Sequence, residues 1–141
     1  MATKRDLLQM LKSVSLFEGL TNKELESVLR VGKEVTHEGG ETLVEQGKRG
    51  IGFHLITDGK ARVLVGGRTA ARLKAGDYFG EMSLLDGQPR SATVQAETDV
   101  RTLSLASWDF LPLLDRHPSI ARKMLVEMSQ RLREAEDSIT H

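Results

Sequence analysis

The sequence predicts a mainly β fold: an antiparallel β-roll of the jelly-roll (double-stranded β-helix) kind, with N-terminal helices before it and a pair of C-terminal helices after it. Three observations predict this class. Eleven of the 13 glycines lie between residues 33 and 106, where they separate short runs of apolar and β-branched residues. Residues 1–31 and 107–141 instead place apolar residues at the helical period. The length of 141 residues is that of one domain, so we expect a single domain spanning 1–141.

Composition removes several classes of protein. A hydrophobic share of 39% with zero formal net charge excludes a disordered chain, and the 20 basic and 20 acidic residues leave no basic excess for a nucleic-acid backbone. The absence of cysteine excludes disulfides, thiolate zinc sites and cysteine nucleophiles. No apolar run is long enough to span a membrane, and Asp6, Gln9 and Lys12 interrupt the N-terminal segment. We therefore expect no membrane span, no signal peptide and a cytoplasmic protein.

The N-terminal part, residues 1–31, is expected to form two helices. The first lies between Lys4 and Ser15, and a short turn follows at residues 17–20. Thr21 and Glu24 have the spacing of a capping box, which predicts a second helix from Asn22 to about Arg30. Gly32 lies where a C-terminal cap is expected. The apolar face of the first helix consists of Leu7, Leu8, Met10 and Leu11.

The β-roll is expected over residues 32–106. Asp58-Gly59 and Gly66-Gly67 are hairpin signals, because the residues of each pair tolerate positive φ. Seven or eight short antiparallel strands at this spacing favour a sandwich or barrel. The strand-like runs are Lys33–His37, Thr42–Glu45, Phe53–Thr57, Ala61–Val65, Ala70–Leu73, Ala92–Ala96 and Val100–Leu105.

The C-terminal part, residues 107–141, is expected to form two helices. Ser107 caps a short one, Trp108–Arg116, that ends before Pro118, and Ser119 caps a longer one that continues to about Asp137. In the longer helix apolar residues step by four and three, the pattern of a heptad seam. That seam fits a homodimer contact and packing within the chain equally well. Its members are Ala121, Leu125, Met128, Leu132, Ala135 and Ile139.

The segment from Gly76 to Val94 is the part of the sequence that suggests chemistry. It predicts a strand, a glycine turn, a short helix from Glu81 to about Leu85, and a second turn that ends in Arg90-Ser91. The amide groups of a helix N-terminus bind anions, and a guanidinium suits a phosphate. A carboxylate repels a phosphate but accepts a hydrogen bond from a sugar hydroxyl. The segment therefore predicts a ligand with both a phosphate and a sugar hydroxyl.

The run FGEMSLLDGQPRSATV, residues 79–94, resembles the phosphate-binding cassette of the cyclic nucleotide-binding domain family, and the resemblance covers nearly the whole chain. That family includes the catabolite activator protein, kinase regulatory subunits and gated channels. For a cassette at 79–92 the resemblance implies that Glu81 binds the ribose 2′-hydroxyl and Arg90 the cyclic phosphate. The other implied ligand-binding residues are Ser91, the backbone of Ser83 and Ala92, Gly80 and Met82 in the cassette, and Val63 at the base.

The resemblance implies a non-catalytic sensor of cyclic AMP, with cyclic GMP as the second choice. We expect neither a metal nor another cofactor. We do expect an effector partner, whose identity is unknown. The adenine-reading polar pair of the catabolite activator protein aligns with Ala135-Glu136, and its DNA-binding helix-turn-helix domain has no counterpart in this sequence. Alternatives remain open: a regulatory fragment of a larger channel, kinase or transporter; a phosphodiesterase; a family member without ligand binding; or a plain surface ion pair between Glu81 and Arg90.

Overall fold

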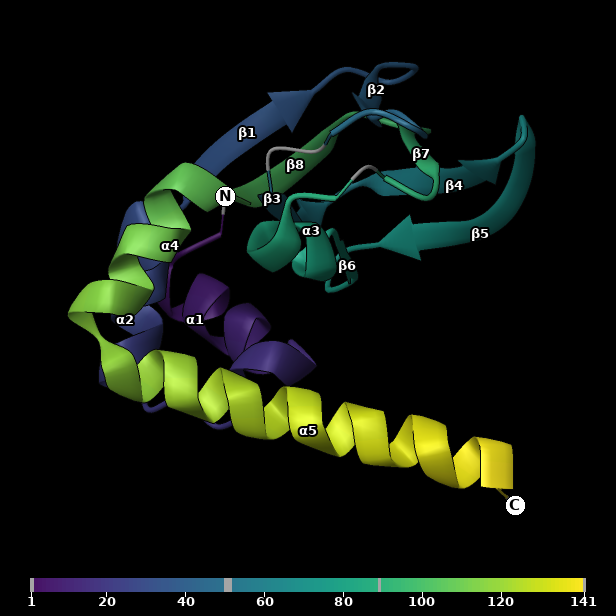
Figure 1. Cartoon of the computed structure of the whole chain (residues 1–141). Coiled ribbons are helices and arrows are strands. Elements are labelled where there is room, and N and C mark those ends of the chain that lie inside the picture. The colour runs from purple at the N-terminus through teal and green to yellow at the C-terminus, as the bar shows by residue number, and fades with distance from the viewer. Residues whose placement is uncertain (1, 50–51, 89, 141) are drawn as a thin grey trace.

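The computed structural model describes residues 2–49, 52–88 and 90–140, and Figure 1 shows their arrangement. Pro89 of the predicted cassette, Gly50 and Ile51 of the predicted roll, and the terminal Met1 and His141 lie outside the described residues. The helices are α1 (Lys4–Lys12), the 3₁₀ helix η1 (Ser15–Phe17), α2 (Asn22–Val31), α3 (Glu81–Asp86), α4 (Ser107–Arg116) and α5 (Pro118–Thr140). The strands are β1 (Lys33–His37), β2 (Thr42–Val44), β3 (Gly52–Asp58), β4 (Lys60–Val65), β5 (Arg68–Lys74), β6 (Tyr78–Phe79), β7 (Thr93–Ala96) and β8 (Val100–Ala106).

The strands form two four-stranded antiparallel sheets, in the orders β1-β8-β3-β6 and β2-β7-β4-β5. The sheets pack face to face, because one buried apolar cluster takes Ile56 and Val100 from the first sheet and Ala61, Val94 and Ala96 from the second. This arrangement confirms the predicted β-roll. Beyond the seven strand-like runs, β6 is an eighth strand, which pairs with β3.

One of the two predicted hairpins is confirmed and the other is wrong. Val65 pairs with Arg68 across Gly66-Gly67, whose φ angles of 58° and 81° are those of a tight two-residue turn. Asp58-Gly59 does not close a hairpin, because β3 already has β8 and β6 as its neighbours and β4 lies in the other sheet. Gly59 (φ 93°) carries the chain across, where a Cβ would overlap the carbonyl oxygen of Asp99. Positive φ at Gly59 thus serves a crossing between sheets.

The two predicted helices at the N-terminus are present as α1 and α2, but α1 ends at Lys12 and the 3₁₀ helix η1 at Ser15–Phe17 was not predicted. Thr21 and Glu24 form the expected capping box, with Glu24 N–H donating to Thr21 Oγ1 at 3.2 Å and Thr21 N–H to Glu24 Oε1 at 2.9 Å. Gly32 is the C-cap of α2 in an extended conformation, and its missing side chain leaves room for Leu103. The apolar faces of α1, η1, α2, α4 and α5 join strands β3 and β8 in one core, which includes Leu11, Phe17, Phe53, Phe110, Ile120 and Met124.

Both predicted caps of the C-terminal helices are wrong. Helix α4 begins at Ser107 itself, so this hydroxyl caps nothing, and α5 begins at Pro118. Proline suits the first helical position because its missing N–H would have no partner there. Ser119 therefore lies inside the helix, where its hydroxyl donates to Glu24 Oε2 at 2.7 Å. No helix in the described residues is long and apolar enough to cross a membrane.

The predicted heptad seam lies mostly in solvent. Leu125, Leu132 and Ile139 are 64%, 63% and 84% exposed, whereas Ile120 and Met124 on the neighbouring face are buried. Figure 1 shows α5 as a long helix below the roll, with its C-terminal half apart from the strands. Packing within the chain therefore does not account for these three residues.

Candidate functional site

The candidate site begins at Gly80, the single residue between β6 and α3. Gly80 is the N-cap of α3 in the left-handed conformation, with φ of 85°. The first intrahelical bond runs from Leu84 N–H to Gly80 O, 3.1 Å. The amides of Glu81, Met82 and Ser83 precede it and have no acceptor within the helix, so they are available to an anion.

Arg90 lies against this turn and is buried, with 7% of its surface exposed. Its Nη2 donates to the carbonyl oxygen of Gly52 on β3, and its Nε has no hydrogen-bond partner. A Cβ on Gly80 would overlap Nη1 of Arg90 and the oxygen of Gly52. Gly80 therefore has two roles: it permits the positive φ, and it leaves the space that the guanidinium occupies.

Arg90 is a buried cation without an anion. In the part of the chain that the structure describes, it forms no ion pair. Burial lowers the pKa of Arg90 from its ordinary value, and the negative charge of Glu81 only partly opposes that effect. A buried charge is costly unless it is paired, so this position favours a bound anion.

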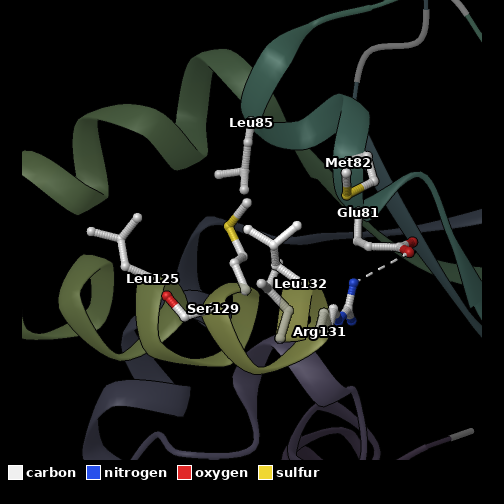
Figure 2. A pocket seen from close by; sticks show the side chains of 9 residues that line it. Glu81, Met82, Leu85, Leu125, Ser129, Arg131 and Leu132 are labelled. Carbon is white, nitrogen blue, oxygen red and sulfur yellow. Dashed lines mark ion pairs between the residues drawn. The ribbon is translucent and has the colours of Figure 1, made fainter. Parts of the chain in front are cut away.

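Glu81 pairs with α5, not with Arg90. Its Oε1 lies 3.9 Å from Nη1 of Arg131, and Figure 2 shows this pair at one end of a groove between α3 and α5. The surface ion pair between Glu81 and Arg90 that the sequence left open is therefore absent. The groove has a volume of about 430 Å³ and is mainly apolar. Its lining consists of Leu16, Glu81, Met82, Leu85, Leu125, Met128, Ser129, Arg131 and Leu132.

The predicted site residues fall into two groups. Gly80, Glu81, Ser83 and Arg90 meet at the first turn of α3. There the Ser83 hydroxyl donates to the Gln88 carbonyl oxygen at 3.3 Å and so helps to close the turn. The others lie around them.

Met82 is 56% exposed and lines the groove, Ser91 is exposed, and Ala92 is half-buried before β7. Val63, on β4, faces the interior of the roll opposite Val94 of β7.

Sequence reasoning missed three contributors to this site: Arg131, the Gly52 carbonyl and His54. Arg131 is 50 positions from its partner Glu81, and no local pattern marks it. His54 is a neighbour of Arg90 in the interior, where its Nδ1 bonds Ser104 Oγ at 2.7 Å and its ring stacks on Phe79. Burial, then the positive charge of Arg90, lowers its pKa to about 4, so the ring is neutral at pH 7.

The model of the cyclic nucleotide-binding domain matches residues 34–117, which include α3, Arg90 and the whole β-roll from β2 to β8. The chain belongs to the cyclic nucleotide-binding domain family. In the described residues no group of three or more histidine, aspartate or glutamate side chains lies where it could hold a metal ion.

Similar proteins agree with this membership. The chain is 37% identical to the cyclic AMP receptor protein of Thermus thermophilus in an alignment of 131 positions that covers 89% of this chain and 61% of the relative. It is also 37% identical to a cGMP-dependent protein kinase of Toxoplasma gondii over 108 residues, 77% of this chain and 10% of the kinase. The chain thus spans less than two thirds of either relative.

Among solved structures, the N-terminal domain of a transcriptional regulator from Streptomyces coelicolor has a TM-score of 0.86 at 30% identity. The match covers 91% of this chain and 95% of that one.

Proposed function

We propose that this domain is a non-catalytic sensor that binds cyclic AMP in preference to cyclic GMP. The observation that carries the proposal is Arg90, a buried guanidinium that forms no ion pair among the described residues, next to amides of the first turn of α3 that have no acceptor within the helix. A cyclic phosphate supplies the missing negative charge and several acceptors for these donors. The family membership supports the same ligand class.

In the proposed complex the phosphate pairs with Arg90 and accepts hydrogen bonds from Ser91 and from the amides of Ser83 and Ala92. Glu81 accepts the ribose 2′-hydroxyl. Because Glu81 is now within ion-pair distance of Arg131, the ribose has to share this carboxylate with α5. Binding at the cassette is thereby linked to the position of the last helix.

Selectivity between the two bases is expected to be modest. Val63 and the apolar residues of the groove offer the base flat contact, and apolar contact separates similar rings far less well than buried hydrogen bonds. The similar proteins are named for both nucleotides. We expect a preference on the order of tenfold, about 1.4 kcal/mol.

Output requires a partner, and α5 is the element that would reach it. We propose that ligand binding shifts the population of α5 positions, by no more than the ligand's differential affinity for them. The exposed seam of Leu125, Leu132 and Ile139 supports a homodimer formed through this helix. If this domain is instead the regulatory part of a larger channel, kinase or transporter, the same shift of α5 would transmit ligand binding to the rest of that protein.

Calorimetric titration with cyclic AMP, cyclic GMP and linear AMP tests the proposal. We expect cyclic AMP to bind at micromolar or lower concentration and Arg90→Ala to cost roughly 2–5 kcal/mol. A matched control is Arg30→Ala, an exposed arginine on α2. Equal affinity of the Arg90→Ala variant and the wild type overturns the assignment. Mass measurement of the ligand after incubation distinguishes a sensor from a phosphodiesterase.

A further inference from the structure

Four cations lie together on the outer side of β4 and β5, where Lys60, Arg72 and Lys74 are exposed and Arg62 is half-buried. Two successive pairs across the strands place like charges opposite each other, Lys60 with Lys74 and Arg62 with Arg72. The intervening Ala61 and Leu73 face the interior cluster, so the four charged side chains share the other face. We call Lys60, Arg62, Arg72 and Lys74 the cationic face.

Both pairs are of the kind that brings side chains close together. The N–H of Lys60 donates to Thr98 Oγ1 (3.0 Å), and its carbonyl oxygen accepts from the N–H of Glu97 (2.8 Å). The N–H of Lys74 donates to Asp77 Oδ2 (2.9 Å), and its carbonyl oxygen accepts from the N–H of Asp77 (2.9 Å). Lys60 and Lys74 therefore form a non-hydrogen-bonded pair. Because the two kinds of pair alternate along an antiparallel ladder, Arg62 and Arg72, two positions farther along, also form a non-hydrogen-bonded pair. In such pairs like charges are closest and most destabilising.

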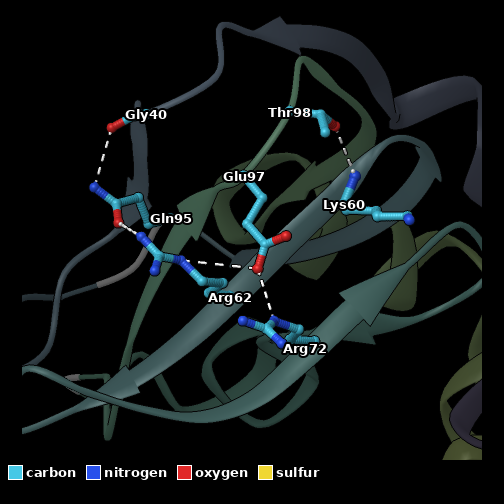
Figure 3. Close-up of polar contacts among 7 residues, drawn as sticks. All are labelled: Gly40, Lys60, Arg62, Arg72, Gln95, Glu97 and Thr98. Carbon is cyan, nitrogen blue, oxygen red and sulfur yellow. Dashed lines mark hydrogen bonds and ion pairs between the residues drawn. The ribbon is translucent and has the colours of Figure 1, made fainter.

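The carboxylates near this face do not neutralise it. Glu97 serves two guanidiniums, at 2.8 Å from Arg72 Nε and 3.9 Å from Arg62 Nε (Figure 3). Asp77 is engaged by the backbone of Lys74. Four cations thus stand beside two carboxylates, and the buried Nε of Arg62 makes no hydrogen bond. The face retains an excess of positive charge that lowers the stability of the sheet.

Arg62 is held in place despite that cost. Its Nη2 donates to Gln95 Oε1 at 2.8 Å, and Gln95 Nε2 donates to the carbonyl oxygen of Gly40 at 3.1 Å (Figure 3). This chain of bonds crosses from β4 over β7 to the turn before β2. A guanidinium fixed in advance loses less freedom when it binds an anion.

The cationic face ends at an open sheet edge. Strand β5 is the last strand of its sheet and is exposed along nearly its whole length. Because Arg72 does not hydrogen-bond β4, its N–H and carbonyl oxygen point toward the open edge. Only a polypeptide can pair with these groups, since a nucleic-acid backbone or a lipid surface offers no matching donors and acceptors in extended register.

We propose that the edge of β5 binds an extended polypeptide with acidic residues at alternate positions, which adds to the sheet as a fifth strand. Alternate side chains of an added strand fall on the outer face, where carboxylates pair with Arg72 and Lys74. The same cations repel the edge of a second copy of β5, so they also select against self-association. The cationic face is on the opposite side of β4 from Val63, which packs on the interior cluster, so the proposal does not depend on nucleotide binding.

Fluorescence anisotropy with a labelled Glu-Val-Glu-Val-Glu-Val-Glu peptide tests this inference on the whole chain. We expect salt-sensitive binding that is lost when glutamine replaces the glutamates, and lost when alternate peptide amides are N-methylated. The Arg72→Glu, Lys74→Glu double variant should weaken binding by about tenfold or more. The matched control is Arg5→Glu with Lys23→Glu, two exposed first-turn positions that favour acidic residues.

Three further readouts keep the proposal falsifiable. Lys74→Gln, which only removes one charge of an opposed pair, should raise the midpoint of thermal unfolding and still weaken peptide binding. The amide of Arg72 should become protected from hydrogen exchange when the peptide is added. No binding of the peptide, or equal binding of the N-methylated peptide, overturns the proposal. If inorganic polyphosphate binds this face more tightly than the peptide does, the proposal is overturned in favour of a nucleic-acid partner. If phosphatidylserine vesicles bind it more tightly, the proposal is overturned in favour of a membrane surface.

Discussion

Oε1 of Glu81 and Nη1 of Arg131 lie 3.9 Å apart, and this ion pair ties the first turn of α3 to the middle of α5. Both side chains are partly exposed, at 23% and 33%. Such a pair adds less than about 1 kcal/mol to stability. Its importance is positional, because the group that we assign to the ribose also contacts the last helix.

Disrupting this pair should therefore move α5 without unfolding the chain. We expect Arg131→Gln, which removes this pair and also the hydrogen bond from Arg131 Nη2 to Ser15 Oγ, to broaden the distances between spin labels at Arg68→Cys and Gln130→Cys; the native chain has no cysteine that would be labelled as well. Glu81→Gln retains the bond to Ser15 and so isolates the contribution of the pair. Saturating cyclic AMP should shift the wild-type distribution, because its ribose competes with Arg131 for Glu81. Arg133→Gln, two positions along α5, is the control. If neither Arg131→Gln nor cyclic AMP changes the distance distribution, the position of α5 is not coupled to the site.

The Glu81 carboxylate should recognise one hydroxyl. We predict that Glu81→Gln lowers cyclic AMP affinity by about 1.5–3 kcal/mol, the value of a hydrogen bond to a charged group. The loss should nearly disappear with 2′-deoxy cyclic AMP, since the partner hydroxyl is absent. Calorimetry with both ligands measures the difference. If the two ligands lose affinity equally, Glu81 has a structural role.

Gly80 should be required for two reasons: its positive φ, and the space that it leaves for Arg90. Gly76 is a comparison that has only the first. Both have positive φ, 85° and 97°, but a Cβ on Gly76 meets nothing within 4 Å. Gly76→Ala should therefore cost only backbone strain, about 1–2 kcal/mol of unfolding free energy. Gly80→Ala should cost more and should also reduce nucleotide affinity by at least about tenfold, because it displaces Arg90. Urea unfolding and calorimetry on both variants decide this.

Arg90 should lower the stability of the unliganded domain. Its guanidinium is buried and has no ion-pair partner among the described residues, so we predict that Arg90→Leu raises the unfolding free energy by about 1–2 kcal/mol while it abolishes nucleotide binding. The gain is limited because the Gly52 carbonyl loses its donor. Added cyclic AMP should stabilise the wild type and leave the variant unchanged. A variant less stable than the unliganded wild type contradicts the prediction.

His54 should make stability depend on pH between about 6.5 and 4. Burial, followed by the positive charges of Arg90 and His37, lowers its pKa from 6.5 to about 4. In that interval the unfolded chain carries a proton on this ring that the folded chain does not. The unfolding free energy therefore falls as the pH is lowered, by about 3 kcal/mol in total, and is unaffected by this ring above pH 6.5.

Urea unfolding at several pH values, with His54→Phe as the comparison, measures this dependence. Phenylalanine retains a ring to stack on Phe79, and Ser104 keeps Thr102 as a partner at 3.0 Å. The variant should show a flatter profile between pH 6.5 and 4.5. Glu24, whose pKa is lowered to about 2, loses its contribution only below pH 4.5 and does not overlap this range. Parallel profiles for variant and wild type would exclude His54.

Local patterns determined the elements of this protein and its family. Capping residues, glycine pairs and alternating apolar residues act over a few positions, so the Thr21 capping box, the Gly66-Gly67 hairpin and the cassette helix at Glu81 could all be predicted. The identity of Arg90 and Glu81 as site candidates came from the same short segment. These are properties that neighbouring residues settle among themselves.

Tertiary structure decided which distant residues meet. It sent β3 and β4 into different sheets, so Asp58-Gly59 makes a crossing, and it let Glu24 bond Ser119, 95 positions away. It also placed Arg131 at Glu81, and it buried Arg90 against the Gly52 carbonyl with no ion pair to any part of the chain that the structure describes. Burial, and the opposition of like charges across β4 and β5, depend on packing between segments that no local pattern relates, because the free energy of a buried charge is set by every element around it.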